Sequence, residues 1–202
     1  MSDSSQSQFI HLRCHSEYSI SDGIVRIPDY VKKALETNMP ALGLTDLSNL
    51  FGAVKFYKSA IASGIKPIFG VDVWIENDAN SEQPHKMLLL CQNQQGFNNL
   101  SELISKAYLE NQVRRKPMIK KNWLFDSHDG LIVLSGSLHG SIGKLLDQNK
   151  IPEAREELLL WKKIFQDRFY LEAQRYGDDL LRKRENQYIE KAIFLAAENK
   201  VP

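Results

Sequence analysis

The sequence has no long hydrophobic run and almost no net charge, and both absences exclude classes of protein. No apolar stretch approaches the ~20 residues that a membrane-spanning helix needs, and the opening MSDSSQSQ lacks the basic flank and apolar centre of a signal peptide. The 26 Lys and Arg residues nearly balance the 25 Asp and Glu residues. A net charge of +1 provides no global attraction to nucleic acids or acidic membranes, so any such binding requires a local basic patch.

Cysteine is also scarce. Cys14 and Cys91 are too far apart in the sequence to form a zinc-ligand pair. Two such residues suit a reducing compartment, where they serve as small buried hydrophobic side chains. We therefore expect a cytoplasmic protein.

The residues that are present are typical of a folded α/β domain. With 202 residues, 43% of them hydrophobic, the chain can bury a substantial core. Short apolar runs alternate with amphipathic stretches, which indicates strands and helices taking turns around a mostly parallel sheet. The predicted strands are Phe9 to Cys14, Ala41 to Thr45, Pro67 to Ile75, Met87 to Cys91, Leu131 to Ser135 and Phe169 to Ala173. The predicted helices are Ile27 to Thr37, Ala53 to Ser63, Phe97 to Glu110, Glu153 to Phe165 and Arg184 to Asn199.

A helix-ending signal occurs three times. Asn38 precedes Pro40, and Gly64 precedes Pro67, in each case before an apolar strand. Asn and Gly accept the left-handed backbone that ends a helix, and Pro cannot continue one. The pattern returns at Asn199 to Pro202, where the sequence stops. We expect a fragment that lacks its next strand; the alternative is a natural domain that ends on an unpaired helix.

Chemistry-bearing residues follow several of the predicted strands. The carboxyl ends of parallel strands meet on one face, which makes these positions a plausible site. They are His15, Asp46, Asp72, Ser135 to Ser137 and Glu172 to Tyr176. For each residue alone, a helix cap or turn is the stronger interpretation, because Asp and Ser commonly serve there.

The two N-terminal histidines do not form a metal pair. His11 and His15 have helical i, i+4 spacing, but on a strand four residues span ~13 Å, so the two rings cannot share an ion. A His-x-His pair on this strand would need a histidine at position 13, and that residue is Arg13.

Several motifs in order resemble the N-terminal PHP (polymerase and histidinol phosphatase) domain of the bacterial DNA polymerase III alpha subunit. They are FIHLRCHSEYSISDG (9–23), ALGLTDLSNLFG (41–52), KPIFGVDV (66–73), LLLCQNQQGFNNL (88–100), LISKAY (103–108) and GLIVLSG (130–136). The resemblance implies a distorted (β/α)7 barrel, truncated before its last strand. It also implies a disordered tail at 1–8, an incomplete PHP domain at 9–202, and polymerase domains that lie outside the fragment.

The positions that match the family's metal ligands are mostly altered. The resemblance places Arg13 and His15 on its His-x-His motif, and Leu47 on the histidine of Thr-Asp-His after Asp46. Asp72 stands for a Glu, Lys86 for a His with His85 one place out of register, Ser137 for a Cys and Tyr176 for a His. A divalent ion ~6 Å from the Arg13 guanidinium would face roughly 5 kcal/mol of repulsion at an effective dielectric near 20. We therefore expect no bound metal and no catalytic residue in this fragment. Arg13 is expected to hold the carboxylates of Asp46 and Asp72 in the metals' place. The alternative is a strand arginine that faces solvent.

The resemblance implies a parent enzyme that synthesises DNA with Mg²⁺ in a domain absent here, whereas this domain needs no cofactor. The module is expected to stabilise the polymerase and to dock the proofreading exonuclease subunit. Other replisome subunits and DNA would be reached through the parent protein, and no membrane is involved. The alternative is an active metal-dependent PHP phosphoesterase or 3'-5' exonuclease.

Five cations occur between positions 114 and 121 with no acidic residue among them: Arg114, Arg115, Lys116, Lys120 and Lys121. They form a possible phosphate or partner patch. A solvated loop is the favoured interpretation, because no aromatic residue interleaves with them for base stacking. Gly136, Gly140 and Gly143 fit no phosphate-binding motif and are expected to lie in turns and caps. No nucleophile elbow surrounds Ser135 or Ser137 near His139, which argues against a hydrolase triad.

Overall fold

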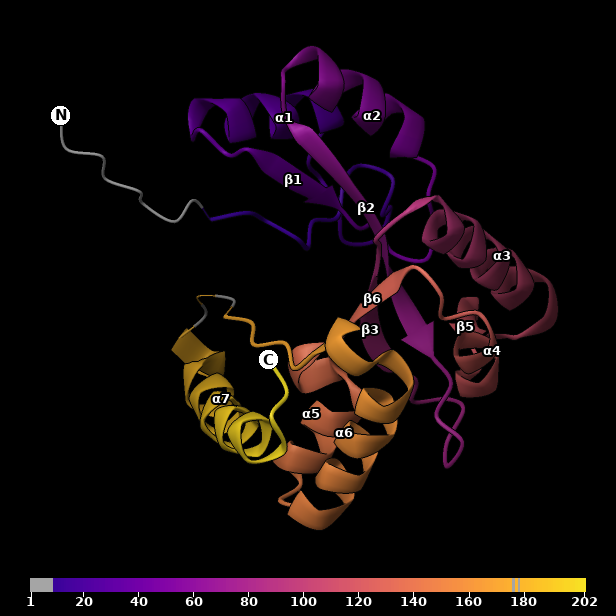
Figure 1. The fold of residues 1–202 in the computed structure, drawn as a ribbon, viewed down its shortest axis with the longest axis vertical. Helices are drawn as coiled ribbons and strands as arrows, with labels where there is room; N and C mark the ends of the chain where they lie inside the picture. Colours follow the sequence, from indigo (N-terminus) through magenta and orange to yellow (C-terminus); the bar gives the residue numbers. More distant parts are fainter. Residues whose placement is uncertain (1–8, 176, 178) are drawn as a thin grey trace, which may run out of the picture. The chain divides into compact units, whose positions relative to one another are not determined.

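The structure is a computed structural model that describes residues 9–175, 177 and 179–202 (Figure 1). Contacts within the chain divide it into two compact units, Met1–Val71 and Asp72–Pro202. Strand β2 (Lys66–Ile75) passes from the first unit into the second. The predicted tail at 1–8 lies outside the described residues. Among the residues that are described, no helix combines the length and the apolar character that crossing a bilayer requires.

The first unit contains α1 (Ile27–Glu36), β1 (Ala41–Leu44), α2 (Ala53–Ala62) and the start of β2. Strands β1 and β2 are parallel, with Ala41 opposite Lys66. The two helices pack side by side and bury Val31 and Phe56 against Leu42 (Figure 1).

The predicted helix-ending signals are confirmed in this unit. Asn38 and Gly64 both have positive φ, at 54° and 70°. Each residue directly follows the last turn of its helix and directs the chain into the next strand.

The predicted strand Phe9 to Cys14 is wrong, because these residues form no regular strand. The segment still runs beside β1: the Gly43 amide donates to the His11 carbonyl at 2.8 Å, and the Thr45 amide donates to the Cys14 carbonyl at 3.0 Å. The Cys14 amide donates to Thr45 Oγ1 instead of to a backbone carbonyl. A Cβ on Gly43 would lie 2.7 Å from the Leu12 carbonyl oxygen, so this close approach requires glycine.

The second unit holds the other elements. They are β3 (His85–Cys91), α3 (Gln94–Glu110), β4 (Gln112–Val113), β5 (Lys116–Ile119), α4 (Lys121–Asp126), β6 (Leu131–Leu134), η1 (Ser137–His139), α5 (Ser141–Asp147), α6 (Ile151–Phe165), η2 (Gln166–Arg168), β7 (Phe169–Tyr170) and α7 (Asp179–Asn199). The strand order is β4-β5-β2-β3-β6-β7. Helices α6 and α7 both border α5 (Figure 1), and Trp161, Phe165 and Phe169 are fully buried.

The α/β class is confirmed, with a mixed sheet. Strand β2 is parallel to β5 and β6 is parallel to β7, but β3 is antiparallel to β6. The connection between β2 and β3, residues 76–84, is short and contains no helix. A parallel crossover needs a longer connection, usually with a helix, so these residues cannot form one. Strand β7 ends earlier than predicted, at Tyr170, and the next amide, of Leu171, donates to the Pro202 carbonyl at 2.8 Å.

Two short helices and one hairpin were not predicted. Helices α4 and α5 span fewer than two full turns and so give little periodicity. Gly136 and Gly140 lie at helix caps as expected, with Gly136 at φ 80°. Gly143 does not lie in a turn: it is inside α5, where a Cβ would overlap the Ser137 carbonyl.

Candidate functional site

The residues predicted for the site divide between the two units. Arg13, His15 and Asp46 belong to the first unit, and Asp72, Lys86 and Ser137 belong to the second. Tyr176 lies outside the described residues. Each unit therefore holds its own group of these residues.

In the first unit, Asp46 is a buried carboxylate that three donors hold. Only 2% of the residue is exposed. Asp46 Oδ1 accepts from the Ser16 amide at 2.6 Å and from Ser19 Oγ at 2.7 Å, and Oδ2 accepts from Ser16 Oγ at 2.8 Å. The Leu47 amide donates to Ser19 Oγ, which fixes that hydroxyl. Hydrogen bonds to the charged form replace the solvation that burial removes.

The serines are functional neighbours that the sequence analysis missed. Within the part of the chain that the structure describes, the hydrogen bonds of Asp46 come from Ser16 and Ser19, and Arg13 is not among its donors. Arg13 therefore does not take the expected place at Asp46 among these residues, and its expected contact with Asp72 stays a prediction. His15 is also engaged elsewhere, because its Nδ1 lies 3.0 Å from Oδ1 of Asp22.

In the second unit, Asp72 and Lys86 form a nearly buried ion pair. Lys86 Nζ donates to Asp72 Oδ2 at 3.2 Å, and the side chains are 15% and 3% exposed respectively. The lysine ammonium also lies 4.3 Å from the centre of the Trp74 ring. Two residues that match metal-ligand positions are therefore occupied with each other, one as a cation and one as an anion.

The histidine beside Lys86 cannot replace it. Neighbouring residues of a strand point to opposite faces of the sheet, so His85 faces away from Asp72. Burial lowers the pKa of His85 to about 4, and the nearby charges of Lys144 and Lys121 act in the same direction. Among the described residues, its buried Nδ1 has no hydrogen-bond partner.

The ends of β6 and β7 meet as predicted. The Gly136 amide donates to Glu172 Oε2, and the Glu172 amide donates to Ser135 Oγ. Tyr188 on α7 donates to the Glu172 carbonyl at 2.7 Å, and burial raises the pKa of Tyr188 to about 12. Ser137 is buried and has a positive φ of 51°. These contacts cross-link strand ends and helix α7.

The basic segment at 114–121 is not a loop, so that part of the expectation is wrong, but Arg114, Arg115 and Lys116 are exposed to solvent as expected. Strands β4 and β5 form a hairpin whose turn is Arg114 and Arg115. Lys121 is engaged in a partly buried ion pair with Glu157 at 2.8 Å. The fold also brings aromatic rings to this segment, since Lys116 lies over Trp74 and Lys120 lies over Trp123.

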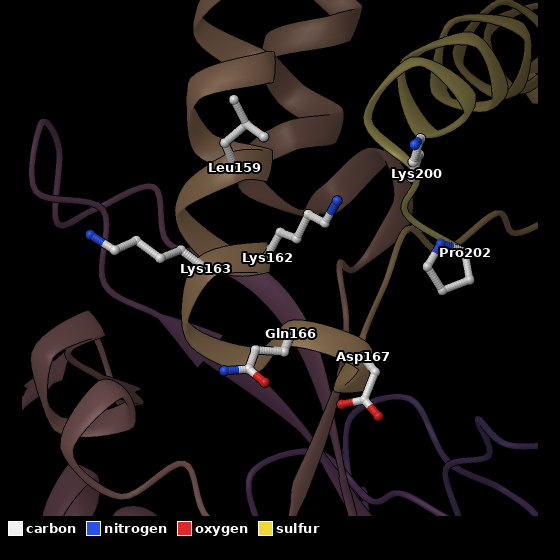
Figure 2. Close-up of a pocket in the computed structure, with 7 residues that line it drawn as sticks. All are labelled: Leu159, Lys162, Lys163, Gln166, Asp167, Lys200 and Pro202. Atoms are coloured by element: carbon white, nitrogen blue, oxygen red, sulfur yellow. The ribbon is translucent and has the colours of Figure 1, made fainter.

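One open groove, of about 650 Å³, lies at the end of α6, and none of the predicted site residues lines it. Figure 2 shows Lys162 and Lys163 pointing to opposite sides, with Lys162 on the side of Lys200. Lys162 Nζ donates to the Asn199 carbonyl at 2.6 Å. The groove therefore has a basic rim, and none of the described residues that line it is a buried polar side chain that could orient a ligand.

The residues present do not fit a divalent metal ion. Among the described residues, no group of three or more His, Cys, Asp or Glu side chains is placed to hold one. Hydrogen-bond donors surround Asp46, and the ammonium of Lys86 lies against Asp72. A metal ion would have to displace these groups to reach either carboxylate.

Comparison with known proteins decides the family. The model of the PHP domain matches residues 11–176. The chain belongs to the PHP domain family. It is 40% identical over 198 residues to the DNA polymerase III subunit alpha of Vibrio cholerae, which covers 98% of this chain and 17% of that protein. The same subunit of Escherichia coli K12 is 38% identical over 198 residues. The resemblance to this subunit is therefore confirmed, and the PHP chain spans about a sixth of the length of these relatives.

The PHP fold is also found among solved structures. A protein of Bifidobacterium adolescentis that was assigned as a metal-dependent phosphoesterase superposes with a TM-score of 0.59 at 11% identity. The match covers 97% of this chain and 85% of that one. This likeness confirms the fold class, a PHP-type α/β fold.

Proposed function

We propose that this PHP chain is the metal-free PHP module of a DNA polymerase III alpha subunit. Its role is to stabilise a polymerase that carries out replicative DNA synthesis and to dock the proofreading exonuclease subunit. The polymerase itself would use Mg²⁺ outside this module and act in the cytoplasm with other replisome subunits. The identity of 40% across nearly the whole chain supports the polymerase assignment.

The Lys86–Asp72 ion pair carries the metal-free part of the proposal. An ammonium 3.2 Å from the carboxylate already supplies the positive charge that a metal would bring. Adding a divalent ion there would place two cations against each other in a site that is largely closed to water.

Metal analysis and a phosphoesterase assay test this part. The purified chain is loaded with Zn²⁺, Mn²⁺ or Fe²⁺, desalted, and assayed on bis(p-nitrophenyl) phosphate and on 3'-labelled DNA. We expect substoichiometric metal and no hydrolysis above the Asp72→Ala variant. Stoichiometric metal with hydrolysis that Asp72→Ala abolishes would favour an active PHP phosphoesterase or 3'-5' exonuclease instead.

Docking is tested by binding to the purified proofreading exonuclease subunit. Size-exclusion chromatography and calorimetry are expected to show a one-to-one complex with the chain. A chain that is folded by circular dichroism but forms no complex at micromolar concentrations would contradict the docking role.

A further inference from the structure

The β4–β5 hairpin is built around an unfavourable turn. Arg114 and Arg115 have φ of 51° and 64°, which is the left-handed backbone that a two-residue hairpin loop requires. Asn and Gly adopt this conformation readily, whereas bulky side chains do so at a cost. Strain of this kind gathers at positions selected for something other than stability. Here the strained turn presents two adjacent guanidinium groups at an exposed tip.

Most of the positive charge around this tip is not neutralised. Arg114 pairs with Glu82, but both side chains are more than half exposed, so that pair exchanges easily with solvent ions. Arg115, Lys116 and Lys120 have no carboxylate within ion-pair distance among the described residues. Of the five cations in this segment, Lys121 is the one that forms a partly buried ion pair with a described residue.

Aromatic rings lie at both ends of β5. At the start of the strand, Lys116 lies 4.7 Å from the centre of the Trp74 ring. Just beyond its end, Lys120 lies 5.3 Å from Trp123, and Lys106 of α3 lies 4.3 Å from the same ring. Both tryptophans are only partly buried. The fold thus supplies the aromatic component that the basic segment lacks in the sequence.

A third ring belongs to the same region. Tyr108, near the end of α3, is 40% exposed, and its carbonyl accepts from the side chain of Gln112 on β4. Cations that follow a strand, combined with partly exposed aromatic side chains, are the combination that binds single-stranded nucleic acids without sequence preference. An acidic peptide would use the charges but would gain little from the rings.

We propose that the hairpin surface, defined as Arg114, Arg115, Lys116 and Lys120 with Trp74 and Trp123, binds the phosphate backbone of single-stranded nucleic acid. The lysines and arginines contact phosphates, and the rings contact the bases or sugars that follow. This binding is a property of the chain itself and does not depend on the proposed polymerase role. Its strength falls with salt, because each phosphate contact releases a condensed counterion.

The test uses a double substitution that removes charge without weakening the hairpin. Arg114→Asn with Arg115→Gly installs the preferred residues for this turn and eliminates both guanidinium groups. Binding of the 202-residue chain to fluorescein-labelled oligo(dT) is measured by fluorescence anisotropy over a range of NaCl concentrations. We expect the double variant to bind about tenfold more weakly and to reduce the slope of log K against log salt by about 1.4.

A matched control separates the effect of the hairpin surface on binding from the effect of the net charge of the protein. Lys32 and Lys163 are exposed lysines of other helices, and Lys32→Gln with Lys163→Gln changes the net charge equally. This control is expected to bind within twofold of the wild type. Wild-type protein that shows no salt-dependent binding, or a control as weak as the hairpin variant, would overturn the proposal. Polyglutamate of equal charge that competes as well as oligo(dT) would overturn it in favour of an acidic protein partner.

Intrinsic fluorescence gives an independent readout. Trp161 is fully buried, so quenching by oligo(dT) reports on Trp74 and Trp123. We expect quenching that Trp123→Phe reduces and that high salt reverses. Binding without any change in tryptophan fluorescence would show that the rings do not contact the nucleic acid, which would contradict the proposal.

Discussion

At the scale of single residues, the charge of Asp72 is balanced by Lys86 inside the fold. Replacing Lys86 with Met keeps most of the side-chain volume but removes the ammonium from a carboxylate that is 3% exposed. We expect Lys86→Met to lower the free energy of unfolding by about 3 kcal/mol, as measured from urea midpoints. Lys33→Met provides the control, because the Lys33–Glu36 pair is exposed and its loss costs less than about 0.5 kcal/mol. Equal midpoints for wild type and Lys86→Met would show that the ion pair contributes nothing.

Ser19 is the second residue whose contribution to stability can be measured separately. Its hydroxyl donates to buried Asp46 at 2.7 Å and accepts from the Leu47 amide at 2.9 Å. Ser19→Ala removes a hydrogen bond to a charged group and is expected to cost about 2 kcal/mol. Ser105→Ala, at an exposed position on α3 where the hydroxyl bonds only the preceding turn, should change the same urea midpoint little. If both variants unfold at the same denaturant concentration, the Asp46 network is not a source of stability.

His85 gives the protein a pH dependence with a definite sign. Its pKa is about 4 in the folded state, because of burial and the charges of Lys144 and Lys121, which outweigh Glu157 and Asp78. The unfolded chain, with a pKa near 6.5, therefore binds more protons between these values. Stability from this group is fully present above about pH 6.5 and is lost as the pH falls toward 4.

Replacing His85 separates its contribution to the pH dependence of stability from the contributions of other titrating groups. Urea midpoints at about pH 7 and pH 5 are expected to differ less in His85→Leu than in the wild type. His11→Gln is the control, since His11 is exposed. A His85→Leu variant with an unchanged pH dependence would contradict the assignment.

At the scale of elements, the strained turn of the β4–β5 hairpin is expected to lower the stability of the fold. Replacing Arg114 and Arg115 by Asn and Gly places residues that adopt positive φ readily at two positions where φ is 51° and 64°. We expect a gain of about 1 kcal/mol, which exceeds the loss of the exposed Arg114–Glu82 pair. Hydrogen exchange of the hairpin amides, slower in the variant, measures it. Faster exchange would mean that the arginines stabilise the turn.

At the scale of the whole molecule, the proposed lack of a bound metal predicts that chelation does not change stability. A metal that bound only the folded state at a hundred times its Kd would stabilise it by about 2.7 kcal/mol. For a chain of this size such a metal would raise the thermal midpoint by roughly 5 to 10 °C. We expect the same midpoint in EDTA as in Zn²⁺ or Mn²⁺. A drop of several degrees on chelation would show that a metal site persists.

The sequence by itself determined the α/β class, the family and most of the regular elements. Periodicity identifies α1, α2, α3, α6 and α7, and local backbone preference explains the helix ends at Asn38 and Gly64. These are local properties, so neighbouring residues are enough to reveal them. The hairpin escaped detection because its turn uses Arg114 and Arg115 where the usual signal is Asn-Gly.

Only the tertiary structure decided which groups neutralise or hydrogen-bond the carboxylates at the altered metal-ligand positions. Lys86 reaches Asp72 because β2 and β3 are adjacent strands, and His85 cannot because it lies on the other face. Asp46 receives its hydrogen bonds from Ser16 and Ser19, some thirty residues earlier in the chain. Such pairings depend on which strands and loops meet and on the face that each residue presents. A sequence motif specifies the residue types, but strand order and register specify their partners.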